Sequence, residues 1–399
     1  MTKVNFPILT FNEAGIQIID GDRGFAYPKS SDFMESGYCL FLTAQNVTSD
    51  GFKFNEGQFV SEKKHNELRK GTLQRQDIVL TSRGTVGNVA LYDDRIPYDV
   101  LRINSGMLIL RNSGKSFETD YLYALLRSPL FKKQIRRLSF GSAQPQITVQ
   151  VTNGFEFPCP SKPEQKKIAE ILSSWDRAIE TLGKLIDVKA KFKTGLMQKL
   201  LTGKMRFKVF NGNLFERKSL GQVAKINMGQ SPSSEFYNKD RTGLPLIQGN
   251  ADCKNRKTFP TTYTTQITKR ACIGDIIMSV RAPVGTIAKC RHEVCIGRGV
   301  CAIRGEKIDN EYLYQFLLSF ETRWNRFAQG STFTAVNSND IKKLPFAFPK
   351  DARGQKKIAQ ILLSADRELE FLSSMLDMLT SQKKGLMQKL LTGKIRVKA

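Results

Sequence analysis

Two arginines occupy matching places in the chain, each after an apolar run and just before a turn that ends in glycine. Arg83 lies in the segment Gln76–Gly87, and Arg281 lies in the segment Gly274–Gly285. A guanidinium group can form two hydrogen bonds with the edge of a guanine base, or it can clamp a phosphate. We therefore predict that Arg83 and Arg281, with Thr85 in the first turn, contact nucleic acid. A surface arginine or a structural ion pair is the plainer alternative at both positions.

Carboxamide side chains form a second group of candidates, because an amide can pair with the edge of adenine through two hydrogen bonds. They occur in Gln45-Asn46 and in Gln248-Gly249-Asn250. Asn and Gly are also frequent in turns, so turn formation is the alternative for both segments. The loops at Gly141-Ser142 and Gly330-Ser331 have a composition that can approach phosphate, although such loops are common.

Four potential metal ligands fall within twelve residues, at Cys290, His292, Cys295 and Cys301. Their spacing lacks the paired Cys-x-x-Cys knuckles that mark strong zinc signatures. The same stretch is typical of strands that bury small thiols. We therefore predict no metal site in this chain.

The sequence offers little from which to build a catalytic site. Gly114-Lys115-Ser116 lacks the upstream glycine of a phosphate-binding loop. No Asn-Pro-Pro or Asp-Pro-Pro core, of the kind that amino-methyltransferases have, is present. Glu164-Gln165-Lys166 imitates part of a nuclease motif but has no partner carboxylate, and His65 and His292 are the only histidines. We predict a non-catalytic chain.

Charge gives the strongest global signal. The 399 residues include 62 Lys and Arg against 37 Asp and Glu, which gives a net charge of +25. A surplus of this size favours fast, salt-sensitive encounters with polyanions, and nucleic acid is the natural partner. A basic solubility surface or an anionic membrane is the alternative from charge alone. The length and the 40% apolar content suit two or three domains.

The cysteines and the apolar runs bear on the compartment. Seven cysteines are odd in number, and their spacing is not that of a small disulfide scaffold. Residues Met1–Gln17 do not have the pattern of a signal segment, and no apolar run is long enough to span a bilayer. These features predict a reduced, cytoplasmic protein without a membrane partner.

An internal repeat organises the chain. Gln165–Lys204 and Gln355–Lys394 match in a constant register of 190 residues, and both end in the identical ten residues GLMQKLLTGK. In each copy the apolar residues alternate in steps of four and three, which is the pattern of a coiled-coil seam. Gly195 and Gly385 are predicted to interrupt the helices near their ends.

The two seams predict that the helices pair with each other, antiparallel, around an approximate twofold axis. Packing of each stripe on a domain core is the alternative. The seam positions that we assign to helix pairing or subunit docking are Leu172, Ile179, Leu182, Leu362, Leu369 and Leu372.

The segments between the helices echo each other more weakly. Tyr121-Leu122-Tyr123 matches Tyr312-Leu313-Tyr314, and Phe157-Pro158 matches Phe348-Pro349. The predicted architecture is α+β, with two mixed α/β globular domains separated and closed by two long helices. The predicted boundaries are 1–160 for the first domain, 161–207 for the central helical region, 208–350 for the second domain and 351–399 for the C-terminal helical region.

This plan resembles that of the specificity subunits of type I restriction–modification systems, and the likeness covers essentially the whole chain. The near-identical helices carry part of it, and local strings carry the rest. The strings in the first half are similar to one class of target recognition domain and those in the second half to another. They are Ile19–Gly24, Leu80–Asn88, Arg102–Met107, Met228–Pro232 and Pro245–Asn250.

The resemblance implies a DNA sequence-recognition subunit. Each variable domain would read one half of an asymmetric, bipartite site in double-stranded DNA, and the helices would hold the readers apart and dock two adenine-methyltransferase subunits. Motor–nuclease subunits would join them, and S-adenosylmethionine, ATP and Mg²⁺ would belong to these partners, with no cofactor in this chain. Residues 164–193 would span about 45 Å as a helix, against about 34 Å for a turn of B-DNA.

Two other function classes remain open from the sequence. The first is a self-contained DNA methyltransferase or nuclease, which turnover by the purified chain alone would reveal. The second is a coiled-coil scaffold that binds DNA without sequence preference, which equal affinity for all duplexes would reveal.

Overall fold

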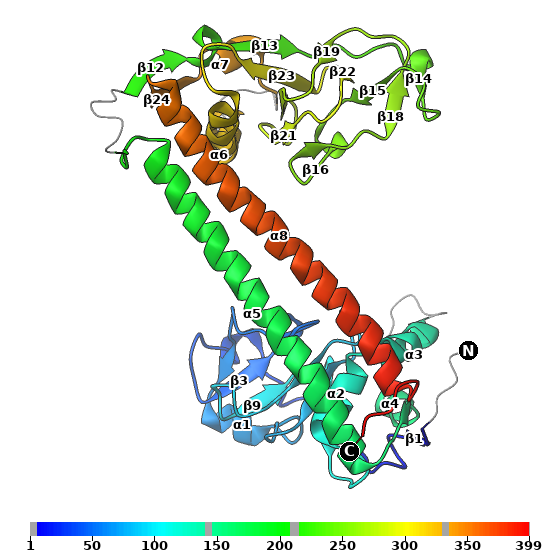
Figure 1. Cartoon of the computed structure of the whole chain (residues 1–399). Helices are drawn as coiled ribbons and strands as arrows, with labels where there is room; N and C mark the ends of the chain where they lie inside the picture. Colours follow the sequence, from blue (N-terminus) through cyan, green and yellow to red (C-terminus); the bar gives the residue numbers. More distant parts are fainter. Residues whose placement is uncertain (1–5, 140–145, 208–214, 329–334, 399) are drawn as a thin grey trace. The chain divides into compact units, whose positions relative to one another are not determined.

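A computed structural model describes most of the chain, namely residues 6–139, 146–207, 215–328 and 335–398. The chain divides into two compact units (Figure 1). The first unit comprises Met1–Leu182 and Met375–Ala399, and the second comprises Gly183–Ser374. Each unit therefore combines one globular region with a part of each long helix, so the units differ from the four consecutive segments predicted from the sequence.

The first globular region is built on a four-stranded antiparallel sheet in the order β2-β10-β7-β8. A second sheet, in the order β6-β3-β9, contains a parallel pair between β3 and β9. Two short pairs, β1-β11 and β4-β5, complete the region. The strands are β1 (Ile8–Thr10), β2 (Ile16–Asp20), β3 (Cys39–Leu42), β4 (Val47–Thr48), β5 (Gly51–Phe52), β6 (Phe59–Val60), β7 (Ile78–Thr81), β8 (Val89–Leu91), β9 (Leu101–Ile103), β10 (Met107–Asn112) and β11 (Glu156–Pro158).

Short helices cover this region and connect its strands. Strand β7 is buried along its whole length, because it lies in the middle of the sheet and both of its faces are covered. Ile78 and Leu80 point into one apolar cluster and Val79 into another, as the alternation of a strand requires. The helices are η1 (Ser30–Asp32), η2 (Ala44–Asn46), α1 (Glu62–Glu67), α2 (Thr119–Leu126), α3 (Pro129–Ser139) and α4 (Val149–Asn153).

The second globular region has two larger sheets, in the orders β13-β23-β20-β21-β17-β16 and β14-β18-β15-β22-β19, and the pair β12-β24. Its helices are η3 (Leu220–Gln222), η4 (Ser234–Phe236), η5 (Asn250–Asp252), α6 (Asn310–Ala328) and α7 (Ser338–Lys342). Its strands are β12 (Phe215–Ser219), β13 (Ala224–Met228), β14 (Tyr237–Asn238), β15 (Leu244–Ile247), β16 (Cys253–Lys254), β17 (Lys257–Thr258), β18 (Thr262–Thr264), β19 (Arg270–Ala271), β20 (Ile276–Ser279), β21 (Ile287–Lys289), β22 (Val294–Ile296), β23 (Val300–Gly305) and β24 (Pro345–Pro349).

The two regions share one framework despite their different sequences. The antiparallel order β2-β10-β7-β8 of the first recurs as β13-β23-β20-β21 in the second. The parallel pair β3-β9 recurs as β15-β22. The predicted pair of mixed α/β domains is therefore confirmed, and the common framework places the loops after β7 and β20 at the same position.

The two long helices are α5 (Lys162–Leu200) and α8 (Ala352–Leu391), of 39 and 40 residues. The prediction that Gly195 and Gly385 interrupt them was wrong, because both glycines lie inside continuous helix. Apolar packing of the flanking turns outweighs the cost of about 1 kcal/mol for a glycine in a helix.

Gly203 and Gly393 instead follow the helix ends. Both have positive φ angles, of 73° and 69°, which suit glycine after a helix terminus. A Cβ atom at Gly203 would lie 2.9 Å from the ring of Phe215, and one at Gly393 would lie 3.0 Å from the ring of Phe6. The repeat is therefore reproduced at the ends of both helices.

Within each unit, α5 and α8 run antiparallel. In the first unit Glu164 pairs with Arg396 and Asp176 pairs with Lys383. In the second unit Lys189 pairs with Glu368 and Lys193 pairs with Asp366. Arg396 lies just beyond the end of α8, and the other partners lie on α5 and α8. In both units, the residue numbers rise along α5 as they fall along α8 and the segment after it, which confirms the predicted antiparallel pairing.

Candidate nucleic-acid interface

The turns that carry Arg83 and Arg281 have the same hydrogen-bonding pattern. The hydroxyl of Thr81, the last residue of β7, donates to the carbonyl of Thr85 and accepts from the backbone N–H of Asn88 at 2.9 Å. In the second unit, the hydroxyl of Ser279 donates to the carbonyl of Pro283 at 2.6 Å and accepts from the N–H of Thr286 at 2.9 Å. A hydroxyl at the strand end therefore fixes each turn.

Both arginine side chains are exposed on these fixed turns. With the amide of Gln146 turned so that its oxygen faces Arg83, that oxygen accepts from Nη2 at 2.8 Å and from Nε at 3.2 Å. Arg281 forms an isolated bridge with Ala335, which occupies the corresponding place in the second unit. The two arginines thus lie at equivalent positions but have different neighbours.

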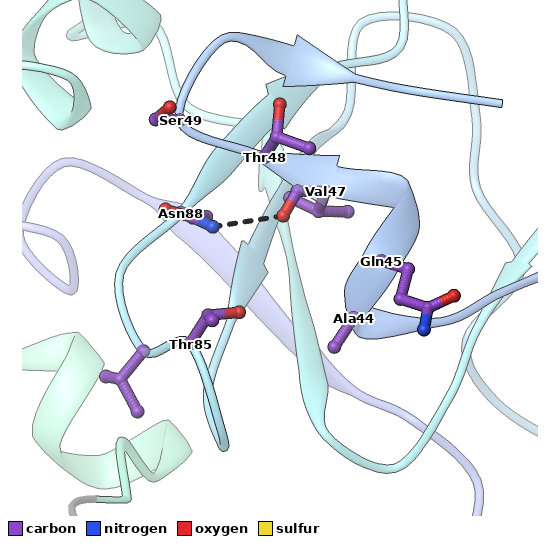
Figure 2. A pocket seen from close by; sticks show the side chains of 8 residues that line it. Ala44, Gln45, Val47, Thr48, Ser49, Thr85 and Asn88 are labelled. Carbon is purple, nitrogen blue, oxygen red and sulfur yellow. Dashed lines mark hydrogen bonds between the residues drawn. The ribbon is translucent and has the colours of Figure 1, made fainter. Parts of the chain in front are cut away.

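Gln45 and Thr85 both line a shallow pocket of about 440 Å³. Figure 2 shows Gln45 on η2 and Thr85 on the turn after β7, and the amide of Asn88 donates to the carbonyl of Val47 at 3.1 Å. This hydrogen bond ties the η2 loop to the arginine turn. Gln45 and Thr85 are both exposed, so their polar groups can contact a ligand.

Asn46 does not share this role. Its side chain is 2% exposed, and its amide nitrogen donates to the carbonyls of Lys53 and Glu56 at 3.1 and 2.9 Å. Its oxygen accepts from the N–H and the hydroxyl of Thr43. The prediction that Asn46 contacts DNA is contradicted by this burial, because the amide is used within the loop. Turn formation, the alternative, explains this residue.

Gln248 directly follows β15, and Asn250 is the first residue of η5. Gln248 is exposed and Asn250 is half-buried. A Cβ atom at Gly299 would lie 2.0 Å from the carbonyl oxygen of Gln248, and the carbonyl of Gly299 accepts from the N–H of Val280, the residue before Arg281. The backbone therefore brings Gln248 beside the Arg281 turn.

Two exposed arginines next to these turns were missed from the sequence. Arg298 stands between Gly297 and Gly299, and its N–H donates to the hydroxyl of Ser231 at 3.1 Å. Arg23 pairs with Asp20 and donates to the carbonyl of Ser105 at 3.4 Å. The glycines around Arg298 were the available signal, because they mark a tight turn at a strand junction. The loops at Gly141-Ser142 and Gly330-Ser331 lie outside the described residues.

The profile of the type I restriction modification DNA specificity domain matches residues 17–190 and 213–377. The MjaX specificity subunit, assigned to a type I restriction enzyme of Methanocaldococcus jannaschii, is 33% identical over 362 residues, which cover 85% of this chain and 83% of that protein.

Two solved structures have a similar fold. The S subunit of a type I restriction–modification system from M. genitalium matches with a TM-score of 0.64 and 17% identity, covering 98% of this chain and 99% of the other. A structure from work on assembly and conformational transition of the type I R-M system matches with a TM-score of 0.60 and 21% identity, over 99% and 100%. The chain belongs to the type I restriction modification DNA specificity family. It is a specificity subunit and not itself the catalytic chain.

The seam residues of this specificity subunit fall into two groups. Leu172, Leu182 and Leu362 are buried, whereas Ile179, Leu369 and Leu372 are half-buried. Leu172 joins the core of the first unit, and Leu362 joins that of the second. Each of these cores also holds residues of the opposite helix. Helix pairing and packing on a domain core, the two alternatives from the sequence, therefore occur together.

The cysteine-rich stretch of the second unit is part of its core. Cys290, Cys295 and Cys301 are buried and His292 is exposed. Burial raises the pKa of the Cys290 thiol to about 12, so this sulfur is a thiol rather than a thiolate at neutral pH. Within the described residues, no group of three or more His, Cys, Asp or Glu could hold a metal ion. In that same part of the chain, no helix is long and apolar enough to cross a membrane.

Proposed function

We propose that this specificity subunit reads an asymmetric, two-part target in double-stranded DNA, with one half-site for each unit. One observation carries the proposal: the same fixed turn occurs twice but presents Arg83-Gly84-Thr85 in one unit and Arg281-Ala282-Pro283 in the other. The shared hydrogen-bonding pattern supports equivalent placement of the two turns on DNA, and their different side chains support different base contacts. The predicted readers are Arg83, Thr85 and Gln45 in one unit and, in the other, Arg281, Gln248 and Asn250.

Electrostatics supports duplex DNA as the target. The net charge of +25 attracts the polyanion, and exposed arginines such as Arg23 and Arg298 flank the predicted readers. Contacts with phosphate release counterions, so the affinity is expected to fall steeply as salt rises. Sequence selectivity would come from the base contacts, which depend less on salt.

The long helices carry a feature that supports docking of two copies of one partner. Leu185 and Val188 are 41% and 62% exposed on α5, and their repeat counterparts Met375 and Met378 are 39% and 54% exposed on α8. Positions beside a coiled-coil seam usually carry charged residues. Apolar residues at the same two repeat positions of both helices suit a partner that packs on each copy in the same way.

Membership of the family supports a choice of partners. Two adenine-methyltransferase subunits would dock on the helices, and motor–nuclease subunits would complete the restriction enzyme. S-adenosylmethionine, ATP and Mg²⁺ would be bound by these partners, and the assembly would act in the cytoplasm, where its DNA lies. Sequence choice by this chain would then direct chemistry that is carried out elsewhere in the complex.

A genome-wide map of adenine methylation, in host cells with and without this gene, tests the proposal. We expect one split, asymmetric motif to vanish on deletion and to return with the intact gene. Complementation with Arg83→Ala or Arg281→Ala should relax or abolish one half-motif each, while Arg177→Ala, an exposed arginine on α5, should restore the whole motif. A palindromic motif, or an unchanged map, would contradict the proposal.

A further inference from the structure

The loop between β2 and η1 presents an aromatic ring to solvent. Phe25 has a relative exposure of 102%, the highest of the large apolar side chains exposed among the described residues. Its neighbours Ala26 and Tyr27 pack on the apolar cluster that contains Phe41, and the rings of Tyr27 and Phe41 meet edge to face at 5.8 Å. The loop therefore buries the two residues that follow Phe25 and leaves that ring outside.

This exposure is built into a fixed loop. The carboxylate of Asp22 accepts hydrogen bonds from the backbone N–H groups of Arg69, at 2.6 Å, and of Arg23, at 2.8 Å. The N–H of Tyr27 donates to the carbonyl of Gly24 at 3.1 Å, which closes a turn around Phe25. Gly24 has a φ of 109°, and a Cβ atom there would meet nothing within 4 Å. The ring is thus held at an open tip rather than on a loose segment.

The tip adjoins the predicted DNA-reading turn. Arg23, two residues before Phe25, donates to the carbonyl of Ser105. The next residue, Gly106, accepts through its carbonyl from the N–H groups of Ser82 and Arg83 at 2.8 and 3.2 Å. One short turn, at residues 104–106, therefore connects the Phe25 loop with the Arg83 turn.

The segments tied to the Phe25 loop carry exposed cations. Arg23, Arg69, Lys70 and Arg83 are all exposed, and Arg69 is tied to the same loop through Asp22. An exposed apolar side chain accompanied by arginine and lysine is the chemistry of proteins that insert a wedge between base pairs while the cations hold the flanking phosphates. A protein partner for a single aromatic side chain would not require these neighbouring positive charges.

The second unit repeats the arrangement in a weaker form. Gly21 in the first unit and Gly229 in the second lie at the same place, because a Cβ atom at either would be about 2 Å from a carbonyl oxygen of the neighbouring turn. The loop that follows Gly229 carries Phe236, which is 38% exposed on η4. Two domains with divergent sequences thus both place an exposed phenylalanine after this glycine.

We propose that Phe25 is a wedge that inserts at a base step of the DNA half-site bound by the first unit. The inference rests on the proposed function and adds a contact of a different kind. The arginine turn reads base edges, whereas the ring would unstack one step and select for a sequence that unstacks easily. Pyrimidine–purine steps deform most readily, so the half-site is expected to contain one at the place of insertion.

The test uses the full chain assembled with its methyltransferase subunits and a duplex that carries the motif found by methylation mapping. 2-Aminopurine replaces one base at a time, because its fluorescence rises when it loses its stacking neighbours. We expect a rise at one step with the wild-type protein and none with Phe25→Ala. Phe25→Ala should also bind about tenfold more weakly, the scale of one lost stacking contact. Phe25→Leu, which keeps an apolar wedge, should retain part of both signals.

Ile8→Ala is the matched control, because Ile8 is an apolar residue of the same unit that is 45% exposed on β1. It should leave both signals unchanged. Unaltered fluorescence and affinity in Phe25→Ala, with methylation of the motif intact, would overturn the wedge while leaving the proposed function standing. Loss of subunit assembly in Phe25→Ala would also overturn it in favour of a protein contact. If wild-type protein showed no preference for the motif, the proposed function itself would fail.

Discussion

Lys193 on α5 forms an ion pair with Asp366 on α8, and the repeat reproduces this pair between Lys383 and Asp176. Each lysine is separated from its counterpart by 190 residues, and so is each aspartate. The other oxygen of each aspartate binds its own globular region, through Arg127 at 3.3 Å in one unit and Gln315 at 2.7 Å in the other. Each aspartate therefore connects α5, α8 and the globular region of its unit.

Removal of either aspartate should lower the free energy of unfolding more than removal of the lysine charge. Burial lowers the pKa of Lys383, against the effect of Asp176, so Asp176→Ala leaves a desolvated cation without its partner. We expect Asp176→Ala to lower the free energy of unfolding by roughly 1–3 kcal/mol. Lys383→Met, which keeps the apolar stem, should cost less than about 1 kcal/mol. Urea unfolding of both single variants and the double variant measures the coupling, and additive effects would contradict a shared interaction.

A second repeated pair, Gln165 and Gln355, fastens each helix start to its globular region. The oxygen of Gln165 accepts from the N–H of Glu118 at 2.7 Å, and its nitrogen donates to the carbonyl of Pro160 at 2.9 Å. Gln355 makes the equivalent hydrogen bonds with Asp309 and Pro349, both at 2.7 Å. Both glutamine side chains are at most 2% exposed.

Gln165→Leu and Gln355→Leu should each destabilise one unit. Leucine leaves a buried N–H and a buried carbonyl without partners, which costs roughly 1–3 kcal/mol for each group. Hydrogen exchange read by mass spectrometry should show faster exchange in the first unit for Gln165→Leu and in the second unit for Gln355→Leu. Gln360→Leu, at an exposed position on α8, is the control and should change neither pattern.

The arrangement of helices and domains could be predicted from the sequence, because it follows from repeats and from the spacing of apolar residues. The 190-residue repeat and the four–three spacing predicted both helices and their pairing, and the strand–arginine–glycine pattern predicted the turns after β7 and β20. Periodicity indicates which face of an element packs against the rest of the protein. On both long helices, the predicted apolar face is the one that packs. The weak echoes between the variable domains likewise correspond to shared strands.

The details of the site depend on contacts between distant residues, which no local pattern reports. Asn46 was predicted to be a reader, but hydrogen bonds to Lys53 and Glu56 use its amide inside the loop. The sequence showed that Gln165 is repeated at Gln355, but it gave no indication that the side chain binds the backbone of Glu118. Arg23 gains its place from the carbonyl of Ser105, 82 residues away. Tertiary hydrogen bonding decided each of these outcomes.

The two glycines that follow the arginine turns offer a matched comparison. Gly87 and Gly285 have similar positive φ angles, of 94° and 88°. A Cβ atom at Gly87 would meet Ile135 at an ordinary 3.6 Å, whereas one at Gly285 would lie 2.3 Å from Cδ1 of Trp324. We expect Gly87→Ala to lower the free energy of unfolding by about 1–2 kcal/mol, because alanine is strained at a positive φ angle. Gly285→Ala should cost about 1–3 kcal/mol more, because the indole must shift. Urea unfolding measures both, and equal costs would contradict the overlap.

The Asp22 anchor predicts a pH dependence of the Phe25 loop. Burial alone would raise the pKa of Asp22, but hydrogen bonds from the backbone N–H groups of Arg69, Arg23 and Lys70 outweigh it and lower the pKa below the ordinary value of 3.8. A carboxyl group whose folded pKa is lowered stabilises the fold above its unfolded pKa, and this contribution is lost as the pH falls through the folded value. The loop should therefore be ordered at neutral pH and released only below about pH 4.

Asp22→Asn should remove most of this dependence, because the amide oxygen is uncharged and can no longer engage all three N–H groups at once. Hydrogen exchange at the amide of Arg69, corrected for the intrinsic effect of pH, should be faster in Asp22→Asn than in wild type at pH 7. The two proteins should converge at low pH. Equal protection of the Arg69 amide in both proteins at pH 7 would show that the carboxylate does not hold the loop.

The helices make two kinds of apolar contact that mutation can separate. Leu182→Asp would place a carboxylate at a seam position that is 8% exposed, where an unpaired charge is costly. Both this change and Leu372→Asp at the matching seam of α8 should disrupt helix pairing and, with it, assembly with the methyltransferase subunits. The exposed pairs behave differently. Leu185→Ser with Val188→Ser should leave the free chain folded, because the side chains already face solvent.

Docking on the repeated exposed pairs predicts a stepwise loss of partners. Leu185→Ser with Val188→Ser should remove one of the two methyltransferase subunits, and Met375→Ser with Met378→Ser should remove the other, because each pair is one copy of the same repeat position. Native mass spectrometry of the assembled complex would then count one partner for either double variant and none for the combination. Two bound partners in the combined variant, with helix pairing intact, would place the docking surface elsewhere on the chain.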